Sequence, residues 1–388
     1  VRGFETVNTS DNITIDSRTE GTFIVNSTFT SQFSFSDGEM NYTYLNLTEQ
    51  AIFLNTSNKG NFVSQIFNAG SNVSWVNVSW NKNNIGNLPS FGAVESGIQG
   101  ANMTGNVLLM HLDETSGEVV DYSGNNNATN LGAQYSQPGQ IDSAMYFNGT
   151  GAVLESSSYT YNFEDELTMA AWFKYSGSGT GSPRVLEISR EGNYDSHCIA
   201  VDSDASVRGW VECDDDQRQA EADDSTTYND GKWHYLVYTY ESPTGKVYVD
   251  GEEKATSSGS CNDLDDGPYL VIGSISNGSG VHPFSQHSYE GYLDELAVWN
   301  RSLSEQEIKN NYIRGLLRLN ISVRSCNNSG CSNTEWNKTF TKSPQELSLP
   351  QNQYFQYKAS FETDNISFSP ALYNVTIFYL GVPSVKIN

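Results

Sequence analysis

The sequence predicts an all-β protein, and three observations support this fold class. Strand-favouring residues are frequent, including 22 Tyr and 18 Phe, and 33 Gly residues are available for turns. Short runs alternate apolar and polar residues, as in Thr22–Val25 and Gln32–Phe35. Few stretches show a helical period. Because a chain of 388 residues is longer than a single hydrophobic core usually organises, we expect two or three domains.

The charge and the hydropathy of the sequence argue against a nucleic-acid partner and against a membrane span. The formal net charge is −25, which argues against a nucleic-acid partner because phosphate binding needs clustered Lys and Arg. No run of 18 or more apolar residues occurs, so we expect no membrane span in this chain. The sequence begins at Val1 without a signal-type segment, and we expect it to be a processed piece of a longer precursor.

The two ends of the chain read as strands separated by turns. Residues 1–60 alternate in the strand manner and form an N-terminal β segment, with a turn at Asp37-Gly38. Strands are expected at 62–67 and 73–80, around the turn Asn68-Ala69-Gly70, and again at 319–326, 353–359 and 373–379. The piece at 373–379, and another at 382–387, could complete the sheet of a neighbouring molecule; the alternative is that they close their own sandwich.

The strands on either side of the middle region resemble one known module. Phe62 to Trp80, then Val323 to Cys331 and Tyr354 to Tyr379, are similar in order to a β-sandwich module of prokaryotic surface proteins. More than 240 residues separate the first piece from the others. The resemblance implies a discontinuous β-sandwich of residues 61–95 with 316–388, into which residues 96–315 are inserted. Insertion at a loop is inexpensive, because the closure entropy grows slowly with length.

The middle region carries a longer series of motifs. They are Leu108–Asp113, Asp121–Asn126, Ala144–Gly149, Leu167–Phe173, Asp230–His234, Val247–Gly251 and Gly291–Ser304. In this order and spacing they resemble the laminin-G-like, concanavalin-A-like lectin/glucanase superfamily. The resemblance implies an antiparallel jelly-roll sandwich over residues 96–315.

The residues of the middle region agree with this fold. Trp172, Trp233 and Trp299 stand in strand-like runs as core residues, and Asp250-Gly251 is a hairpin turn. Ser304 begins a short helix with an acidic first turn.

A calcium site is implied by the same resemblance, near the join of the first and last strands. Its oxygen ligands would be Asp113, Asp121, Ser123, Asn125 and Asp294. The alternative is a plain turn in which Asp121 and Asn125 cap backbone amides. Two further acidic clusters, at 214–224 and 263–266, are read as solvated loops or as a second cation site.

Catalysis is not expected. The β-glucanases of the superfamily carry paired carboxylates on one strand as Glu-x-Asp-x-x-Glu, and this run is absent from the sequence. A saccharide site would need aromatic platforms, for which the candidates are Tyr194, Trp210, His287 and Tyr289. The alternative is that each of them packs in the core or lies in a loop.

Five cysteines are present. Cys326 and Cys331 bracket a turn, and Cys198 and Cys213 flank a hairpin-like segment, so we expect these two disulfides and an unpaired Cys261. Disulfides are typical of an oxidising exterior.

Asn-x-Ser/Thr sequons occur at eighteen positions, of which thirteen lie before residue 96 or after residue 315. We expect N-linked glycans on these flanks. The flank sequons are Asn8, Asn12, Asn26, Asn41, Asn46, Asn55, Asn72, Asn77, Asn320, Asn327, Asn337, Asn365 and Asn374.

The sequence therefore predicts an extracellular or cell-surface protein with a structural or adhesive role. The expected partners are further copies of the chain, forming a filament or surface layer, or glycans and proteins of the cell surface or matrix. The alternative is a carbohydrate-binding module of a larger secreted enzyme.

Overall fold

A computed structural model describes residues 23–381 apart from 30–34, 36, 98, 125, 157–162, 178–180, 190–195, 214–216, 262–263, 265–268 and 276–286. The chain divides into two compact units. We call Val1–Ile85 with Leu316–Asn388 the split unit, and Gly86–Gly315 the inserted unit.

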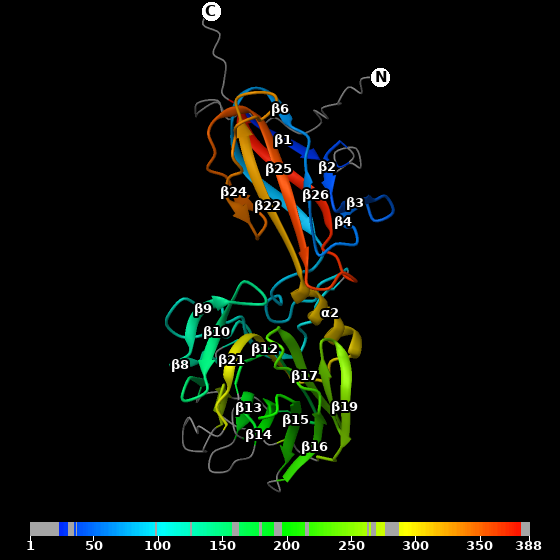
Figure 1. Ribbon diagram of the computed structural model, residues 1–388, viewed down its shortest axis with the longest axis vertical. Coiled ribbons are helices and arrows are strands. Elements are labelled where there is room, and N and C mark those ends of the chain that lie inside the picture. The colour runs from blue at the N-terminus through cyan, green and yellow to red at the C-terminus, as the bar shows by residue number, and fades with distance from the viewer. Residues whose placement is uncertain are drawn as a thin grey trace, which may run out of the picture. The chain divides into compact units, whose positions relative to one another are not determined.

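The split unit contains an 11-stranded sheet whose main path runs β2-β5-β25-β6-β26-β4-β3. In Figure 1 the blue strand β6 lies beside the orange and red strands β25 and β26, although the whole inserted unit separates them in sequence. The strands are β1 (Phe23–Phe29), β2 (Glu39–Asn41), β3 (Thr43–Asn46), β4 (Ala51–Leu54), β5 (Lys59–Val63), β6 (Phe67–Lys82), β22 (Leu317–Cys326), β23 (Thr339–Phe340), β24 (Gln345–Glu346), β25 (Asn352–Thr363) and β26 (Leu372–Gly381).

The pairing of β26 decides between the two alternatives for 373–379. Thr376 of β26 lies opposite Ser79 of β6 on one side and Thr28 of β1 on the other. Because it is paired on both sides, this stretch is an interior part of its own sheet and offers no free edge to a neighbour. Its apolar residues Val375 and Ile377 are buried. The second piece, 382–387, lies outside the described residues.

The inserted unit is a sandwich of two antiparallel sheets. One runs β19-β18-β17-β12-β21-β10-β9 with β7 paired to β21, and the other runs β16-β15-β14-β13-β20-β11-β8. The first contains β7 (Asn106–Met110), β9 (Gln134–Pro138), β10 (Ser143–Asn148), β12 (Glu166–Tyr175), β17 (His234–Glu241), β18 (Thr244–Val249), β19 (Glu252–Ser258) and β21 (Glu290–Trp299). The second contains β8 (Thr129–Leu131), β11 (Val153–Ser156), β13 (Arg184–Ser189), β14 (Ser196–Val201), β15 (Val207–Cys213), β16 (Gln217–Asp224) and β20 (Tyr269–Ile272).

The core of the inserted unit lies between these sheets. Phe147 and Phe173 from the first sheet and Ile188 and Val211 from the second belong to one buried cluster. Each such side chain contributes about 1.5–3 kcal/mol to folding when it leaves water. The all-β class and the sandwich architecture predicted from the sequence are confirmed.

The tryptophans and the helix follow the sequence with one exception. Trp172 and Trp299 are fully buried, whereas Trp233 is only half-buried. Helix α2 (Glu305–Leu316) begins where expected. The Ser304 N–H donates to Glu307 Oε2 at 2.9 Å, and the Glu307 N–H donates to Ser304 Oγ at 3.3 Å, which is a capping box.

The disulfides confirm one expectation and overturn another. Cys326 and Cys331 are bonded, with Cα atoms 5.1 Å apart. The expected pair Cys198–Cys213 is wrong, because Cys213 is bonded to Cys261, and the buried Cys198 forms no disulfide. Cys198 lies opposite Trp210 in the β14–β15 pair. Cys213, at the end of β15, makes an isolated antiparallel β-bridge with Leu264, and this backbone pairing brings the nearby Cys261 close to Cys213.

Candidate functional site

The first and last strands of the inserted unit meet at a cluster of ionisable side chains. Strand β7 pairs with β21, with Met110 opposite Leu296. His111 and Asp113 follow β7 directly, and Asp294 and Glu295 lie within β21. We call these four residues, together with Asp121, the acidic junction.

A β-bulge in β21 shapes this junction. The register between β12 and β21 shifts between Ala170 and Trp172, and Glu295 has φ of 48°. A bulge of this kind re-aims side chains that would otherwise alternate strictly between the two faces of the sheet. Both Asp294 and Glu295 are consequently buried, at 0% and 2% exposed.

Glu295 makes a buried ion pair with His111. Glu295 Oε1 lies 2.6 Å from His111 Nδ1, and its Oε2 accepts a hydrogen bond from the Leu88 N–H at 3.2 Å. Burial alone would lower the pKa of His111, but the hydrogen bond and the charge of Glu295 outweigh it and raise the pKa above its ordinary value. This geometry favours the charged imidazolium.

Asp294 is completely buried. Its Oδ2 accepts a hydrogen bond from the Ile141 N–H at 2.9 Å, while its Oδ1 has no hydrogen-bond partner among the described residues. Burial raises the pKa of Asp294 well above its ordinary value, and the charges of Glu295 and Asp113 raise it further. Asp294 therefore favours its protonated, uncharged form.

Asp121 organises a turn. Its Oδ1 accepts hydrogen bonds from the Leu109 N–H at 3.0 Å and from the N–H and hydroxyl of Ser123 at 2.9 and 2.7 Å. Its Oδ2 accepts one from the Asn126 N–H at 3.2 Å. This is the capping arrangement that the sequence left open as the alternative to calcium. Asn125 lies outside the described residues.

Asp113 is also engaged with neighbouring donors. Its Oδ1 accepts a hydrogen bond from the Ser143 N–H at 2.8 Å, and its Oδ2 accepts one from the Asn87 side-chain amide at 3.1 Å. Asp113 therefore connects the end of β7 to the start of β10.

The proposed calcium ligands of the junction are engaged in hydrogen bonds. The carboxylate oxygens of Asp113 and Asp121 all accept hydrogen bonds, whereas Asp294 Oδ1 has no partner among the described residues. Calcium takes six to eight oxygen ligands. Within the described parts of the chain no group of three or more His, Cys, Asp or Glu side chains has metal-binding geometry. Calcium binding stays a prediction.

One arginine pairs with the described part of the second acidic cluster. The Arg208 guanidinium pairs with Asp202 and lies 2.9 Å from Glu221 and 3.8 Å from Asp223. The acidic residues at 214–216 lie outside the described residues, as do Asp263, Asp265 and Asp266.

Two of the four candidate aromatic platforms are not available at the surface. Trp210 and Tyr289 are both fully buried, and the guanidinium of Arg184 lies 4.4 Å from the Trp210 ring centroid. His287 is half-buried, and Tyr194 lies outside the described residues. The pairing of His111 with Glu295 was not predicted from the sequence. The adjacent pair Asp294-Glu295 was visible in the sequence, but the bulge that buries both side chains was not.

The flank sequons occupy accessible positions wherever their side chains are described. None of these Asn residues is buried: Asn41, Asn55, Asn72, Asn327 and Asn337 are exposed, and Asn46, Asn77, Asn320, Asn365 and Asn374 are half-buried. Asn8 and Asn12 lie outside the described residues, and Asn26 lies on β1. Glycosylation at these positions stays a prediction.

The inserted unit matches a known family of lectin-type domains. Residues 147–309 match the family model of the concanavalin A-like lectin/glucanases superfamily, which confirms the resemblance seen in the sequence. The prokaryotic origin of the flanking module stays a prediction. No helix in the described part of the chain is long and apolar enough to cross a membrane.

Particular relatives match parts of the chain. Pappalysin-1 of Homo sapiens is 27% identical over 197 residues, which cover 44% of this chain and 11% of the relative. C-reactive protein 1.4 of Limulus polyphemus is 33% identical over 84 residues, which cover 20% of this chain and 35% of the relative. The chain thus spans about a tenth and about a third of these proteins.

Solved structures align with parts of the chain at low similarity. The native heptameric SAP-like pentraxin from Limulus polyphemus aligns with a TM-score of 0.36 and 18% identity, covering 42% of this chain and 78% of that chain. The receptor-binding domain of botulinum neurotoxin C/D mosaic serotype aligns with a TM-score of 0.41 and 12% identity, covering 54% of this chain and 51% of that chain.

Proposed function

We propose that this protein is an extracellular surface protein that displays a lectin-type domain and binds glycans or proteins without catalysing a reaction. The observation that carries the proposal is the architecture. A two-sheet lectin-type sandwich interrupts a second β unit, and each unit contains its own disulfide, Cys213–Cys261 and Cys326–Cys331. Disulfides persist in oxidising surroundings, which supports a location outside the cytosol.

The acidic junction supports binding rather than hydrolysis. A glycosidase needs two carboxyl groups that flank a bound sugar. In the junction Asp294 and Glu295 are buried, and their oxygens accept hydrogen bonds from Ile141 and Leu88 or pair with His111. These carboxyl groups stabilise the strand join, and we assign them a structural role.

Binding is tested with the purified chain on immobilised glycans and matrix proteins. We expect retention on at least one glycan or protein, and no release of reducing sugar from the retained glycans. Reducing-sugar release by the purified chain would contradict the non-catalytic proposal. Failure to bind any glycan or protein would contradict the display role.

An adhesive or filament-forming role is the finer form of the proposal. Because β26 is paired on both sides, assembly would have to use another edge, and β2 is a terminal strand of the main sheet path. Electron microscopy of concentrated protein, with and without calcium, tests this role. Ordered fibres or sheets would support it, and isolated monomers would count against it.

The second candidate is a carbohydrate-binding module of a larger secreted enzyme. The small share of pappalysin-1 that the chain covers favours a module of a longer protein. Glycan hydrolysis by the full gene product, but not by this chain, would favour this candidate.

A further inference from the structure

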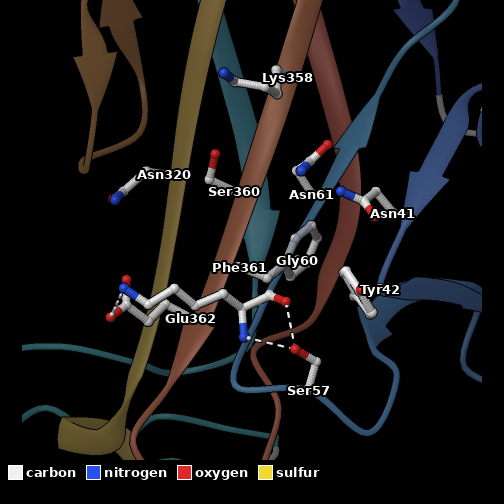
Figure 2. A pocket seen from close by; sticks show the side chains of 11 residues that line it. Asn41, Tyr42, Ser57, Gly60, Asn61, Asn320, Lys358, Ser360, Phe361 and Glu362 are labelled. Carbon is white, nitrogen blue, oxygen red and sulfur yellow. Dashed lines mark hydrogen bonds and ion pairs between the residues drawn. The ribbon is translucent and has the colours of Figure 1, made fainter.

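A groove of about 580 Å³ lies on the split unit, outside the lectin-type domain. Figure 2 shows side chains from β2, β5, β22 and β25 around it. The lining combines polar side chains with the aromatic residues Tyr42 and Phe361, and none of these residues belongs to the acidic junction.

Four lining residues form a straight row across four strands. Asn320 of β22 lies opposite Ser360 of β25, Ser360 lies opposite Asn61 of β5, and Asn61 lies opposite Asn41 of β2. Directly opposed residues of antiparallel strands point to the same face of the sheet. With neighbouring strands about 4.8 Å apart, the four side chains span about 14 Å. We call Asn41, Asn61, Asn320 and Ser360 the polar row; all four are labelled in Figure 2.

The strands beneath the polar row are firmly packed. In β5, β22 and β25, residues that alternate with the row are buried in the core: Phe62, Leu319, Ile321, Ala359 and Phe361. In β2 the neighbour Met40 is exposed. Asn61, Asn320 and Ser360 therefore stand on a fixed scaffold, which favours a preorganised binding site.

The polar row has unused hydrogen-bonding capacity. Within the described parts of the chain, none of its four side chains makes a hydrogen bond to another protein group. Three carboxamides and one hydroxyl supply donors and acceptors side by side. A row that alternates donors and acceptors suits a ligand rich in hydroxyl groups.

An exposed aromatic residue stands at one end of the row. Tyr42 is 65% exposed, and its φ of 53° lies in the left-handed region that a bulky residue rarely adopts. The Asn55 N–H donates to the Tyr42 carbonyl at 2.9 Å and holds this conformation. A Cβ at Gly60 would lie 2.7 Å from the Tyr42 carbonyl oxygen, so only Gly permits the approach. An observed backbone strain at an exposed aromatic side chain is a pointer to function.

The charge at the groove is opposite in sign to that of the whole protein. Lys59 pairs with Glu362 at 3.0 Å, while Lys358 has no carboxylate partner among the described residues. Lys358 Nζ instead lies 5.1 Å from the centroid of the Trp336 ring. Two lysines and one glutamate leave one net positive charge here, in a protein whose formal net charge is −25.

We propose that the polar row and Lys358 form a binding site for a short acidic oligosaccharide, independent of the lectin-type domain. Asn61, Ser360 and the other row members would bind sugar hydroxyls, Tyr42 would pack on a sugar ring, and Lys358 would pair with a carboxylate. The saccharide has two candidate sources. Asn41 and Asn320 each begin a sequon, so it is either free in the medium or attached to this protein.

The first experiment uses the full chain made in a host without N-glycosylation. Hyaluronan tetrasaccharide and tetragalacturonate are titrated by calorimetry beside neutral N-acetylchitotetraose. We expect the acidic probes to bind more tightly, with binding that weakens as salt increases. Asn61→Ala and Ser360→Ala should each weaken binding about fivefold, the effect of one lost hydrogen bond. Lys358→Gln should remove the preference for the acidic probes.

Thr376→Ala is the matched control, because Thr376 is a half-buried strand residue of the same unit outside the groove. It should leave binding unchanged, and circular dichroism should show that every variant is folded. The proposal is overturned if no acidic probe binds, or if binding survives the double variant Asn61→Ala/Ser360→Ala. Neither result would affect the lectin-type domain, whose ligand binding is measured separately.

The second experiment separates the two sources. Glycopeptide mass spectrometry of protein from its natural source shows whether Asn41 or Asn320 carries a glycan. If it does, and the glycosylated protein no longer binds the probes, the protein's own glycan fills the site. If both Asn residues are bare, and the natural protein binds like the unglycosylated one, the site takes a free saccharide.

Discussion

His111 and Glu295 join the first strand of the inserted unit to the bulge in its last strand through a contact of 2.6 Å. Their side chains are only 11% and 2% exposed. Removing one partner would leave the other charge buried and unpaired, which typically costs about 3–5 kcal/mol. The pair therefore makes the stability of the inserted unit depend on pH.

The first prediction concerns that dependence. Because the folded-state pKa of His111 is raised, its stabilisation is fully present below its ordinary value of 6.5 and is lost as pH rises through the folded-state pKa. The pKa of His234 is also raised: burial lowers it, but Asp250 and Asp230 more than compensate. We expect the melting temperature to fall as pH rises above the ordinary histidine pKa of 6.5.

Variants assign this slope to the two histidines. His111→Gln should lower the melting temperature at acidic pH and flatten its decline, and the double variant His111→Gln/His234→Gln should flatten it further. Melting curves followed by circular dichroism measure both effects. An unchanged slope in His111→Gln would show that the ion pair does not control it.

The second prediction concerns Asp294. Its raised folded-state pKa means that stability is lost as pH rises above the ordinary value of 3.8, because the unfolded chain ionises more readily than the folded one. Asp294→Asn cannot ionise and should reduce the pH dependence of the unfolding free energy in this range. Urea unfolding at several pH values measures it. Glu118→Gln, which removes an exposed carboxyl group of the same unit, should keep the slope of the natural protein.

The third prediction separates turn capping from calcium binding at Asp121. Four donors lie on this carboxylate, so Asp121→Ala should cost about 2–4 kcal/mol of stability, with or without a chelator. The measurement is urea unfolding in calcium and in EDTA. If calcium stabilises the natural protein but not Asp121→Ala, the calcium prediction gains support and capping alone is insufficient.

The fourth prediction concerns the disulfides. Cys213 and Cys261 close a loop with a sequence separation of 48, whereas Cys326 and Cys331 are separated by 5. From loop entropy, replacing the first pair by Ser should cost about 4 kcal/mol and the second about 2 kcal/mol. Thiol labelling gives a further check. The native protein should show no reactive thiol, the unfolded oxidised protein one, from Cys198, and the unfolded reduced protein five.

Local sequence signals predicted the structure well. The turn between Cys326 and Cys331 brings the two sulfurs together within six residues. Ser304 and Glu307 form the capping box that begins α2. The hairpin turn Asp250-Gly251 has φ values of 55° and 78°, which the sequence pattern demands. In each case neighbouring residues determine the conformation, so no knowledge of distant strands is needed.

Features that depend on strand order could not be predicted. Cys213 meets Cys261 because the segment after β19 returns to the end of β15, which no local pattern reveals. The polar row likewise exists only in the pairing of four strands, of which β2 and β22 are more than 270 residues apart (317 − 41 = 276). Asn41 and Asn320 appeared in the sequence only as sequons.

The pairing of β6 with β26 fixes an order of events during synthesis. Trp80 lies opposite Val375, so its strand must wait for almost 300 further residues (375 − 80 = 295) before it meets this partner. The inserted unit is complete by Gly315 and can fold as it leaves the ribosome, since domains generally fold as units during synthesis. Until those strands are made, β6 lacks its two neighbouring strands, β25 and β26, so its edges are unpaired and its apolar side chains are exposed. This interval, rather than the mature protein, is when the chain is most exposed to aggregation and most dependent on chaperones.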